Sequence, residues 1–141
     1  MQDAPRNLFV KDVALPLDHC PVLAPNAFFK TALEAMGRSR LGIVCVVDAD
    51  GILRGIVTDG DIRRQLLKMQ KPFSAFFGDD VIEHAIPHPT TVGPDVALLD
   101  AVNLMEEKQV WDLPVVDDGG KLVGLLHLHP IVKLLVSQQD G

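Results

Sequence analysis

The order of apolar and polar positions in the first half of the chain predicts a β-hairpin between two helices. Ala27–Gly37 has apolar residues at helical spacing and ends in a glycine, which predicts a helix that stops there. Ile43–Val47 is a run of mostly β-branched residues, typical of a buried strand. The turn signal Asp48–Gly51 separates it from a second apolar run, Ile52–Val57. Helical spacing then returns over Asp59–Met69.

The second half of the chain repeats this pattern. After another extended, proline-broken segment, a helix is predicted at Val96–Lys108. Strands are predicted at Leu113–Val116 and Leu122–Leu126, and a last helix at Pro130–Val136, with proline in its first turn. The two halves therefore contain the same strand–helix–strand–strand–helix unit.

One constant shift superposes the two copies without a gap. Met36 pairs with Met105 (105 − 36 = 69), and the same shift pairs Gly51 with Gly120. It also pairs turn and core positions elsewhere, including Pro25 with Pro94, Val47 with Val116 and Gly55 with Gly124. A repeat this long is not a solenoid array. We predict an α/β fold of two units, packed sheet to sheet about a pseudo-twofold axis.

Composition excludes several classes of function. The formal charge of −6 argues against a general nucleic-acid binder, and one Trp with no Tyr supplies no base-stacking platform. No stretch is long enough for a membrane span. Cys20 and Cys45 form neither a disulfide framework nor a zinc spacing, which fits a reducing cytoplasm. No nucleophile–base arrangement is readable, so we expect no catalytic residue, no metal site and no required cofactor.

The segment that begins at Gly55 contains the clearest candidate site. Thr58 ends the second strand, and Asp61 follows three residues later in the first turn of a helix. One interpretation is a capping box, in which Thr58 caps the helix and the acid reaches back to the cap amide. The other is a ligand corner, because a hydroxyl and free amides at a helix start suit phosphate, and a carboxylate accepts hydrogen bonds from a sugar diol. These residues alone are compatible with both.

The motifs of both copies resemble the tandem CBS domain pair, or Bateman module. The first copy has Gly55-Ile56-Val57-Thr58-Asp59-Gly60-Asp61, and the second has Leu113-Pro114-Val115-Val116-Asp117. The likeness covers roughly residues 10–137. It implies a linker at 1–9, a first CBS domain at 10–78 and a second at 79–141.

A closer likeness concerns the kind of protein to which such a pair is attached. Thr58-Asp59-Gly60-Asp61-Ile62-Arg63-Arg64 and Gly124-Leu125-Leu126-His127-Leu128-His129 look like the regulatory tail of arabinose 5-phosphate isomerases of the Kdo pathway. The first run also resembles CBS pairs fused to sugar-nucleotide transferases. Either likeness implies a non-catalytic module that regulates the catalytic domain of an enzyme of sugar-phosphate or sugar-nucleotide metabolism. The alternative is a module that only dimerises an enzyme.

The resemblance also implies a ligand and its contacts. Adenosine or related nucleotides would bind between the two copies, with Asp61 on the ribose hydroxyls and Thr58 on the phosphate. Asp59 adds negative charge at this helix start, so the phosphate charge would be offset by Arg63 or by Mg²⁺. Main chain near four residues would flank the base: Val22, Leu23, Val44 and Val46.

The second corner departs from this pattern, because His127 stands in place of Thr58 and Pro130 in place of Asp61. Proline cannot hold a diol, so one competent adenosine site is expected. His127 and His129, two apart at a strand end, would point to one side and could donate to a carboxylate. A CMP-sugar acid is therefore the second candidate ligand. Such pairs also commonly associate, so we expect a homodimer.

Overall fold

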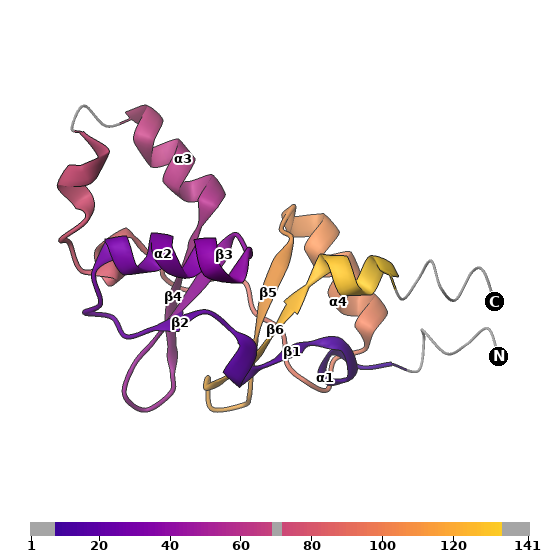
Figure 1. Ribbon diagram of the computed structural model, residues 1–141. Coiled ribbons are helices and arrows are strands. Elements are labelled where there is room, and N and C mark those ends of the chain that lie inside the picture. Colours follow the sequence, from indigo (N-terminus) through magenta and orange to yellow (C-terminus); the bar gives the residue numbers. More distant parts are fainter. Residues whose placement is uncertain (1–7, 69–71, 134–141) are drawn as a thin grey trace. The chain divides into compact units, whose positions relative to one another are not determined.

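The computed structural model describes residues 8–68 and 72–133, which form two compact units (Figure 1). One unit combines the segment up to Cys20 with the segment from Thr90 onward, and the other consists of Pro21–Pro89. Each unit has a three-stranded sheet with helices, as the repeat predicts. No helix in the described part of the chain has the length and apolar character needed to cross a membrane.

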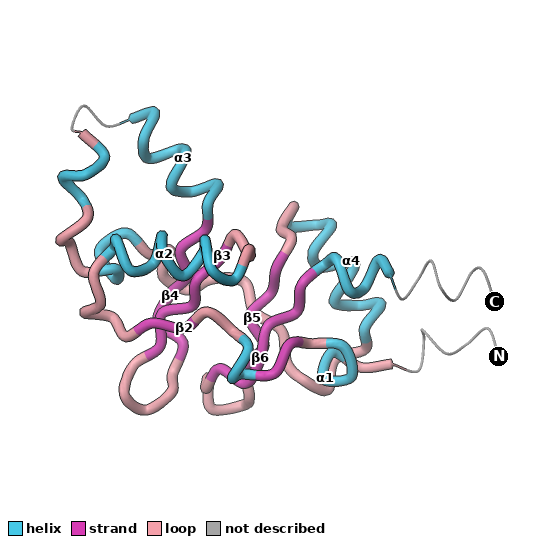
Figure 2. Tube along the Cα trace, in the orientation of Figure 1, coloured by secondary structure: helices cyan, strands magenta, loops and turns pink. Residues whose placement is uncertain are grey.

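The unit of residues 21–89 is built around a sheet in the order β2-β3-β4. β2 pairs parallel with β3, and β3 pairs antiparallel with β4. Its elements are β2 (Val22–Leu23), α2 (Phe29–Ser39), β3 (Ile43–Val47), β4 (Leu53–Thr58), α3 (Asp59–Lys68) and the 3₁₀ turns η3 (Phe73–Phe76) and η4 (Val81–His84). Apolar residues of α2, β3 and β4 pack with Val81 in one core. Figure 2 shows α3 leaving the end of β4 directly.

The other unit has the sheet order β1-β6-β5, with both pairings antiparallel. Its elements are α1 (Val10–Val13), β1 (Leu15–Pro16), the 3₁₀ turn η2 (Leu17–His19), α4 (Leu98–Lys108), β5 (Asp112–Val116) and β6 (Leu122–His127). A helix follows β6 over residues 128–133, so the predicted last helix begins earlier than Pro130. Residues 134–136 of that prediction lie outside the described residues.

The two compact units do not coincide with the two repeats, because each repeat sends its first segment to the other copy's sheet. Leu15 pairs with Leu125 in β6, and Ile86 forms a bridge with Ile56 in β4. Val10 and Val81, one in each segment, have no exposed surface. The predicted boundary at residue 78 follows the sequence repeats, whereas the packed units exchange the lead-in segments, residues 8–20 and 79–89.

Close approach of the lead-in segments explains the glycines that precede Thr58 and His127. A Cβ on Gly55 would lie 2.8 Å from the carbonyl oxygen of Ile86, and one on Gly124 would lie 2.6 Å from that of Leu15. Real Cβ atoms essentially never come so close to backbone oxygen. The glycine of each motif is therefore required by strand packing, independently of any ligand.

The predicted end of α2 is wrong, whereas α4 ends at Lys108 as predicted. Gly37 lies inside α2 rather than stopping it, and the helix continues to Ser39. Arg40 adopts the left-handed conformation (φ 58°) and donates its amide to the Met36 carbonyl, which closes the last turn. Gln109 has the same conformation (φ 57°) at the end of α4. A non-glycine residue in this cap is uncommon, so the first glycine in the pattern was a misleading stop signal.

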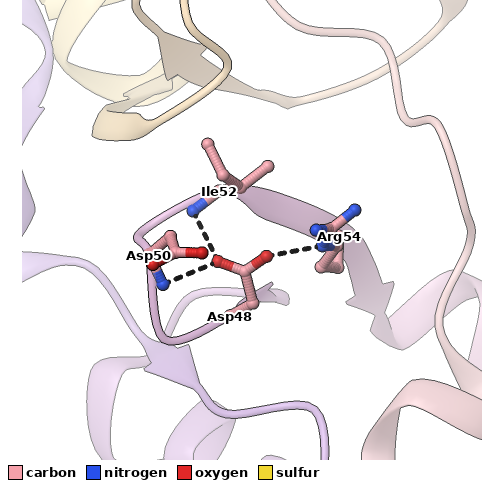
Figure 3. Close-up of polar contacts among 4 residues, drawn as sticks. All are labelled: Asp48, Asp50, Ile52 and Arg54. Atoms are coloured by element: carbon pink, nitrogen blue, oxygen red, sulfur yellow. Dashed lines mark hydrogen bonds and ion pairs between the residues drawn. The ribbon is translucent and has the colours of Figure 1, made fainter.

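The hairpin turn between β3 and β4 is confirmed and is organised by Asp48 (Figure 3). Its Oδ1 accepts hydrogen bonds from the amides of Asp50 and Ile52, at 2.9 and 3.0 Å, and its Oδ2 from Arg54 Nε at 2.7 Å. Burial alone raises the pKa of Asp48. The hydrogen bonds from Ile52, Arg54 and Asp50 outweigh it and hold the pKa below its ordinary value near 3.8.

Replacing Arg54 with valine, the residue at the equivalent position 123, is expected to cost stability only where Asp48 is ionised. A carboxylate whose pKa is lowered by folding contributes stability above its unfolded pKa and loses it as the pH falls through the folded value. The variant should therefore be slightly less stable than the wild type at pH 7 and equal to it near pH 2. Urea unfolding at both values measures this, and an equal deficit at both would contradict the assignment.

Candidate functional site

The strand-to-helix corner formed by β4 and α3 brings the predicted hydroxyl and carboxylate into direct contact. Thr58 Oγ1 accepts a hydrogen bond from the Asp61 amide at 3.1 Å, so Thr58 caps the helix as predicted. The carboxylate does not reach back to the cap amide. Instead Asp61 Oδ2 accepts a hydrogen bond from the Thr58 hydroxyl at 2.5 Å. The capping box is thus only half formed, and the acid holds the hydroxyl in place.

Two arginines, Arg63 and Arg64, follow Asp61 in α3. Arg64 Nη2 pairs with Asp61 Oδ1, three residues earlier in α3. The side chain of Arg64 is 62% exposed and that of Asp61 18%. Arg63, an expected ligand contact, is exposed as well, and its guanidinium lies over Gly60 together with that of Arg64. The corner therefore combines a hydroxyl, a carboxylate and two guanidinium groups within the segment from Thr58 to Arg64.

Asp59 has a different environment from Asp61. Its amide donates to the Gly42 carbonyl at 3.0 Å, which ties the start of α3 to the start of β3. Its carboxylate lies against Gly42, where an added Cβ would come within 2.8 Å of it. Asp59 thus packs on the strand entrance, whereas Asp61 faces Thr58 and Arg64.

The four residues expected to flank a base divide into two kinds. The side chains of Val44 and Val46 have no exposed surface and belong to the core. Their main chain pairs with Val57 and Gly55 of β4, in a strand that has a neighbour on both sides. Val22 and Leu23 form the edge strand β2, and Val22 is exposed. Of these four residues, Val22 and Leu23 on the edge strand are therefore better placed than Val44 and Val46 to offer main-chain groups to a base.

The second corner, in the other unit, has a histidine–aspartate pair. His127 Nδ1 lies 2.6 Å from Asp112 Oδ1, with side-chain exposures of 27% and 12%. The Leu128 amide donates to the Trp111 carbonyl, which repeats the bond from Asp59 to Gly42 one copy earlier. The two corners thus have the same backbone hydrogen bond but different side chains.

His129 does not lie on the strand end with His127, where the sequence analysis placed it. β6 ends at His127, and His129 already lies in the helix over 128–133, where it is exposed. The rule that alternate strand residues share a side does not apply across this junction. Within the described residues, no three His, Cys, Asp or Glu side chains gather where they could hold a metal ion.

Sequence reasoning left one residue of these corners aside and missed another. Arg63 and Arg64 were both candidate phosphate contacts, and only Arg63 was kept as a site residue, although an arginine three residues after an acid on a helix signals an ion pair. Asp112 was missed because simple counting outward from the turn at Asp117 pairs it with Leu126. A register shift between Val115 and Val116 brings it opposite His127.

Comparison with known proteins identifies the family. The model of the CBS domain matches residues 10–68 and 79–137, once for each sequence repeat. The chain belongs to the CBS domain family. The fold agrees: a structure described as CBSX2 in complex with AMP is 29% identical, has a TM-score of 0.82, and is matched over 94% of this chain and 99% of that one. A CBS domain protein from Bacillus anthracis superposes with a TM-score of 0.84 at 18% identity.

Curated relatives of this CBS pair are longer proteins. An uncharacterized protein of Helicobacter pylori is 35% identical over an alignment of 131 residues, and the match covers 89% of this chain and 36% of that protein. Arabinose 5-phosphate isomerase KdsD of Escherichia coli is 30% identical over 131 residues, with 37% of its length covered. The chain thus spans little more than a third of the curated relatives it matches.

Proposed function

We propose that this CBS pair is a non-catalytic regulatory module that binds an adenine nucleotide at the corner of Thr58 and Asp61. The bound nucleotide would modulate an attached or partner sugar-phosphate enzyme of the arabinose 5-phosphate isomerase type. Asp61 would accept hydrogen bonds from the ribose hydroxyls, and Thr58 and Arg63 would contact the phosphate. The edge strand β2, at Val22 and Leu23, would offer main-chain groups to the base.

The observation that carries this proposal is the paired geometry of Thr58 and Asp61. A capping threonine alone needs no carboxylate on its hydroxyl, yet Asp61 is held there at 2.5 Å and keeps 18% of its side chain exposed. A partly buried carboxylate in a fixed position is suited to bidentate recognition of a diol. The AMP complex of the 29% identical CBSX2 supports adenine nucleotides as the ligand class.

The link to sugar-phosphate metabolism rests on similarity alone. KdsD proteins of Escherichia coli, Salmonella typhi and Yersinia pestis are each 30% identical to this CBS pair. The covered part of each is 37% of its length, so the isomerase activity of the whole protein is not assigned to this chain. The regulated enzyme and the sign of regulation belong to the proposal.

A thermal-unfolding panel tests the ligand class. Ligand at 100 times its dissociation constant should stabilise the chain by about 2.7 kcal/mol. We expect AMP, ADP or ATP to raise the unfolding temperature more than CMP does. If no adenine nucleotide shifts it at millimolar concentration, the adenine-nucleotide proposal fails. If CMP-Kdo does not shift it either, a purely structural dimerisation module takes its place.

The Asp112–His127 pair favours a second candidate, a CMP-sugar acid. Because Asp112 engages Nδ1 of His127, the Nε2 atom is the one left for a ligand, and it can donate to a sugar carboxylate when both ring nitrogens carry a proton. Direct competition between CMP-Kdo and AMP separates the two candidates. Tighter binding of CMP-Kdo, lost in His127→Ala, would favour the sugar acid. Tighter binding of AMP that His127→Ala leaves unchanged would favour the adenosine sensor.

We also propose that the module forms a homodimer. Phe28 beside α2 is 59% exposed, and Leu99 on α4 is 37% exposed, so both helices present apolar surface that their own units leave uncovered. Light scattering at high micromolar concentration should give about 31 kDa, twice the chain mass of 15.4 kDa. A monomer at that concentration would contradict the proposal.

A further inference from the structure

The carboxylate of Asp61 already has partners for both oxygens in the structure. Oδ2 accepts the Thr58 hydroxyl, and Oδ1 pairs with the guanidinium of Arg64. A ribose diol would need acceptor positions on this same carboxylate, because an ionised carboxylate only accepts hydrogen bonds. Each carboxylate oxygen has two acceptor positions and Arg64 holds one of those on Oδ1, so a nucleoside that takes this position must displace the guanidinium.

The ion pair between Arg64 and Asp61 lies at the surface, where the arginine is able to change partners. Arg64 lies one turn after Asp61 on the same helix and is 62% exposed, so its side chain can swing into solvent without disturbing the core. Exposed pairs of this kind contribute little to stability. The Thr58–Asp61 bond does not involve Arg64, so the carboxylate remains fixed when the guanidinium leaves.

The surroundings of Gly60 show where the guanidinium would find a new partner. A Cβ placed on Gly60 would lie 3.5 Å from Arg64 Nη1 and 3.9 Å from Arg63 Nη2, so both guanidinium groups gather over this residue. Two like charges held this close favour a dianion between them. A phosphate group fits this requirement, since guanidinium binds it with paired hydrogen bonds.

We propose that Arg64 makes this corner selective for phosphorylated nucleotides over nucleosides, an inference that rests on the proposed nucleotide site. A nucleoside displaces Arg64 from Asp61 and gives the guanidinium nothing in return. A nucleoside monophosphate displaces it and supplies a phosphate that Arg64 and Arg63 then bind together. Arg64 is thus a specificity-determining residue that exchanges a carboxylate partner for a phosphate partner.

Calorimetric titration of adenosine and AMP tests this with Arg64→Gln and a matched control, Arg54→Gln. Arg54 is also exposed and also pairs with an aspartate of the same unit, but in the hairpin turn. In Arg64→Gln we expect AMP to bind about tenfold more weakly and adenosine to bind equally or up to about fivefold more tightly. The preference for AMP should fall by at least about tenfold, whereas Arg54→Gln should leave it unchanged.

The outcomes separate this inference from the proposed function. If wild type binds AMP, Asp61→Ala abolishes that binding, and Arg64→Gln leaves the AMP-to-adenosine preference unaltered, the exchange role is wrong and the nucleotide site stands. Equal weakening of both ligands in Arg64→Gln would likewise overturn it, because it would show that Arg64 only shapes the corner. If wild type binds neither ligand, the nucleotide site itself fails and the inference with it.

Discussion

Asp61→Ala is expected to weaken AMP binding by about 100-fold while leaving the chain folded. Two hydrogen bonds from ribose hydroxyls to a carboxylate are worth about 1.5 kcal/mol or more each, and their loss together corresponds to a factor of this size. The same change removes only the bonds from Thr58 and Arg64 within the protein. Calorimetry measures the affinity, and thermal unfolding measures the cost to the fold.

Asp100→Ala is the matched control for this variant. Asp100 is exposed and lies in the first turn of α4, at the position that Asp61 occupies in α3. Both substitutions remove a helix-start acid, which is worth about 0.3–1 kcal/mol of stability, but only Asp61 stands beside a threonine hydroxyl. Unchanged AMP affinity in Asp61→Ala, with a stability loss like that of Asp100→Ala, would show that the carboxylate acts on the helix alone.

Gly124→Ala is expected to destabilise the chain by about 1–3 kcal/mol, the usual cost of forcing extra atoms into a packed region. The new Cβ would lie 2.6 Å from the Leu15 carbonyl oxygen. Relief would require the β1–β6 pairing to open, because the neighbour is backbone and cannot rotate away. Urea unfolding measures the change in free energy.

Gly37→Ala serves as the opposite control. Gly37 lies inside α2 with nothing within 4 Å of its added Cβ, so alanine there should stabilise the helix by up to about 1 kcal/mol. If Gly124→Ala leaves stability unchanged or raises it as Gly37→Ala does, glycine is not required at position 124 by the lead-in segment. Gly55→Ala, opposite Ile86, should behave like Gly124→Ala.

The sequence was sufficient for the repeating elements because their signals are local. The strand at Ile43–Val47 was predicted with its observed bounds, and the turn at Asp48 follows from a residue type that hydrogen-bonds its own backbone. The helix ends were less predictable. Arg40 and Gln109 close their helices in a conformation that glycine usually supplies, and nothing in their residue type announces it.

The lead-in exchange could not be predicted from local patterns. The pairing of Leu15 with Leu125 joins residues far apart in sequence through backbone groups, which every residue has. The glycine at 124 was visible in the motif, but its reason is the carbonyl that approaches it. A repeat in sequence therefore predicted two units without predicting which segments complete each one.

The candidate site was predictable to the extent that it follows from spacing. Thr58 and Asp61 are three residues apart at a helix start, and this alone brings them together. The partner of His127 depends on a one-residue register shift in the β5–β6 hairpin, so Asp112 was not foreseen. Long side chains such as Arg64 can reach several partners, and spacing does not choose among them.

An amide NMR titration of the isotope-labelled chain with AMP shows directly whether the nucleotide binds at the corner of Thr58 and Asp61. We expect the largest and saturable shifts on the segment from Thr58 to Arg64, with further shifts at Val22 and Leu23, and we expect Asp61→Ala to remove them. Shifts confined to the second corner around His127, or no saturable shift at all, would contradict an adenine nucleotide site at Thr58 and Asp61.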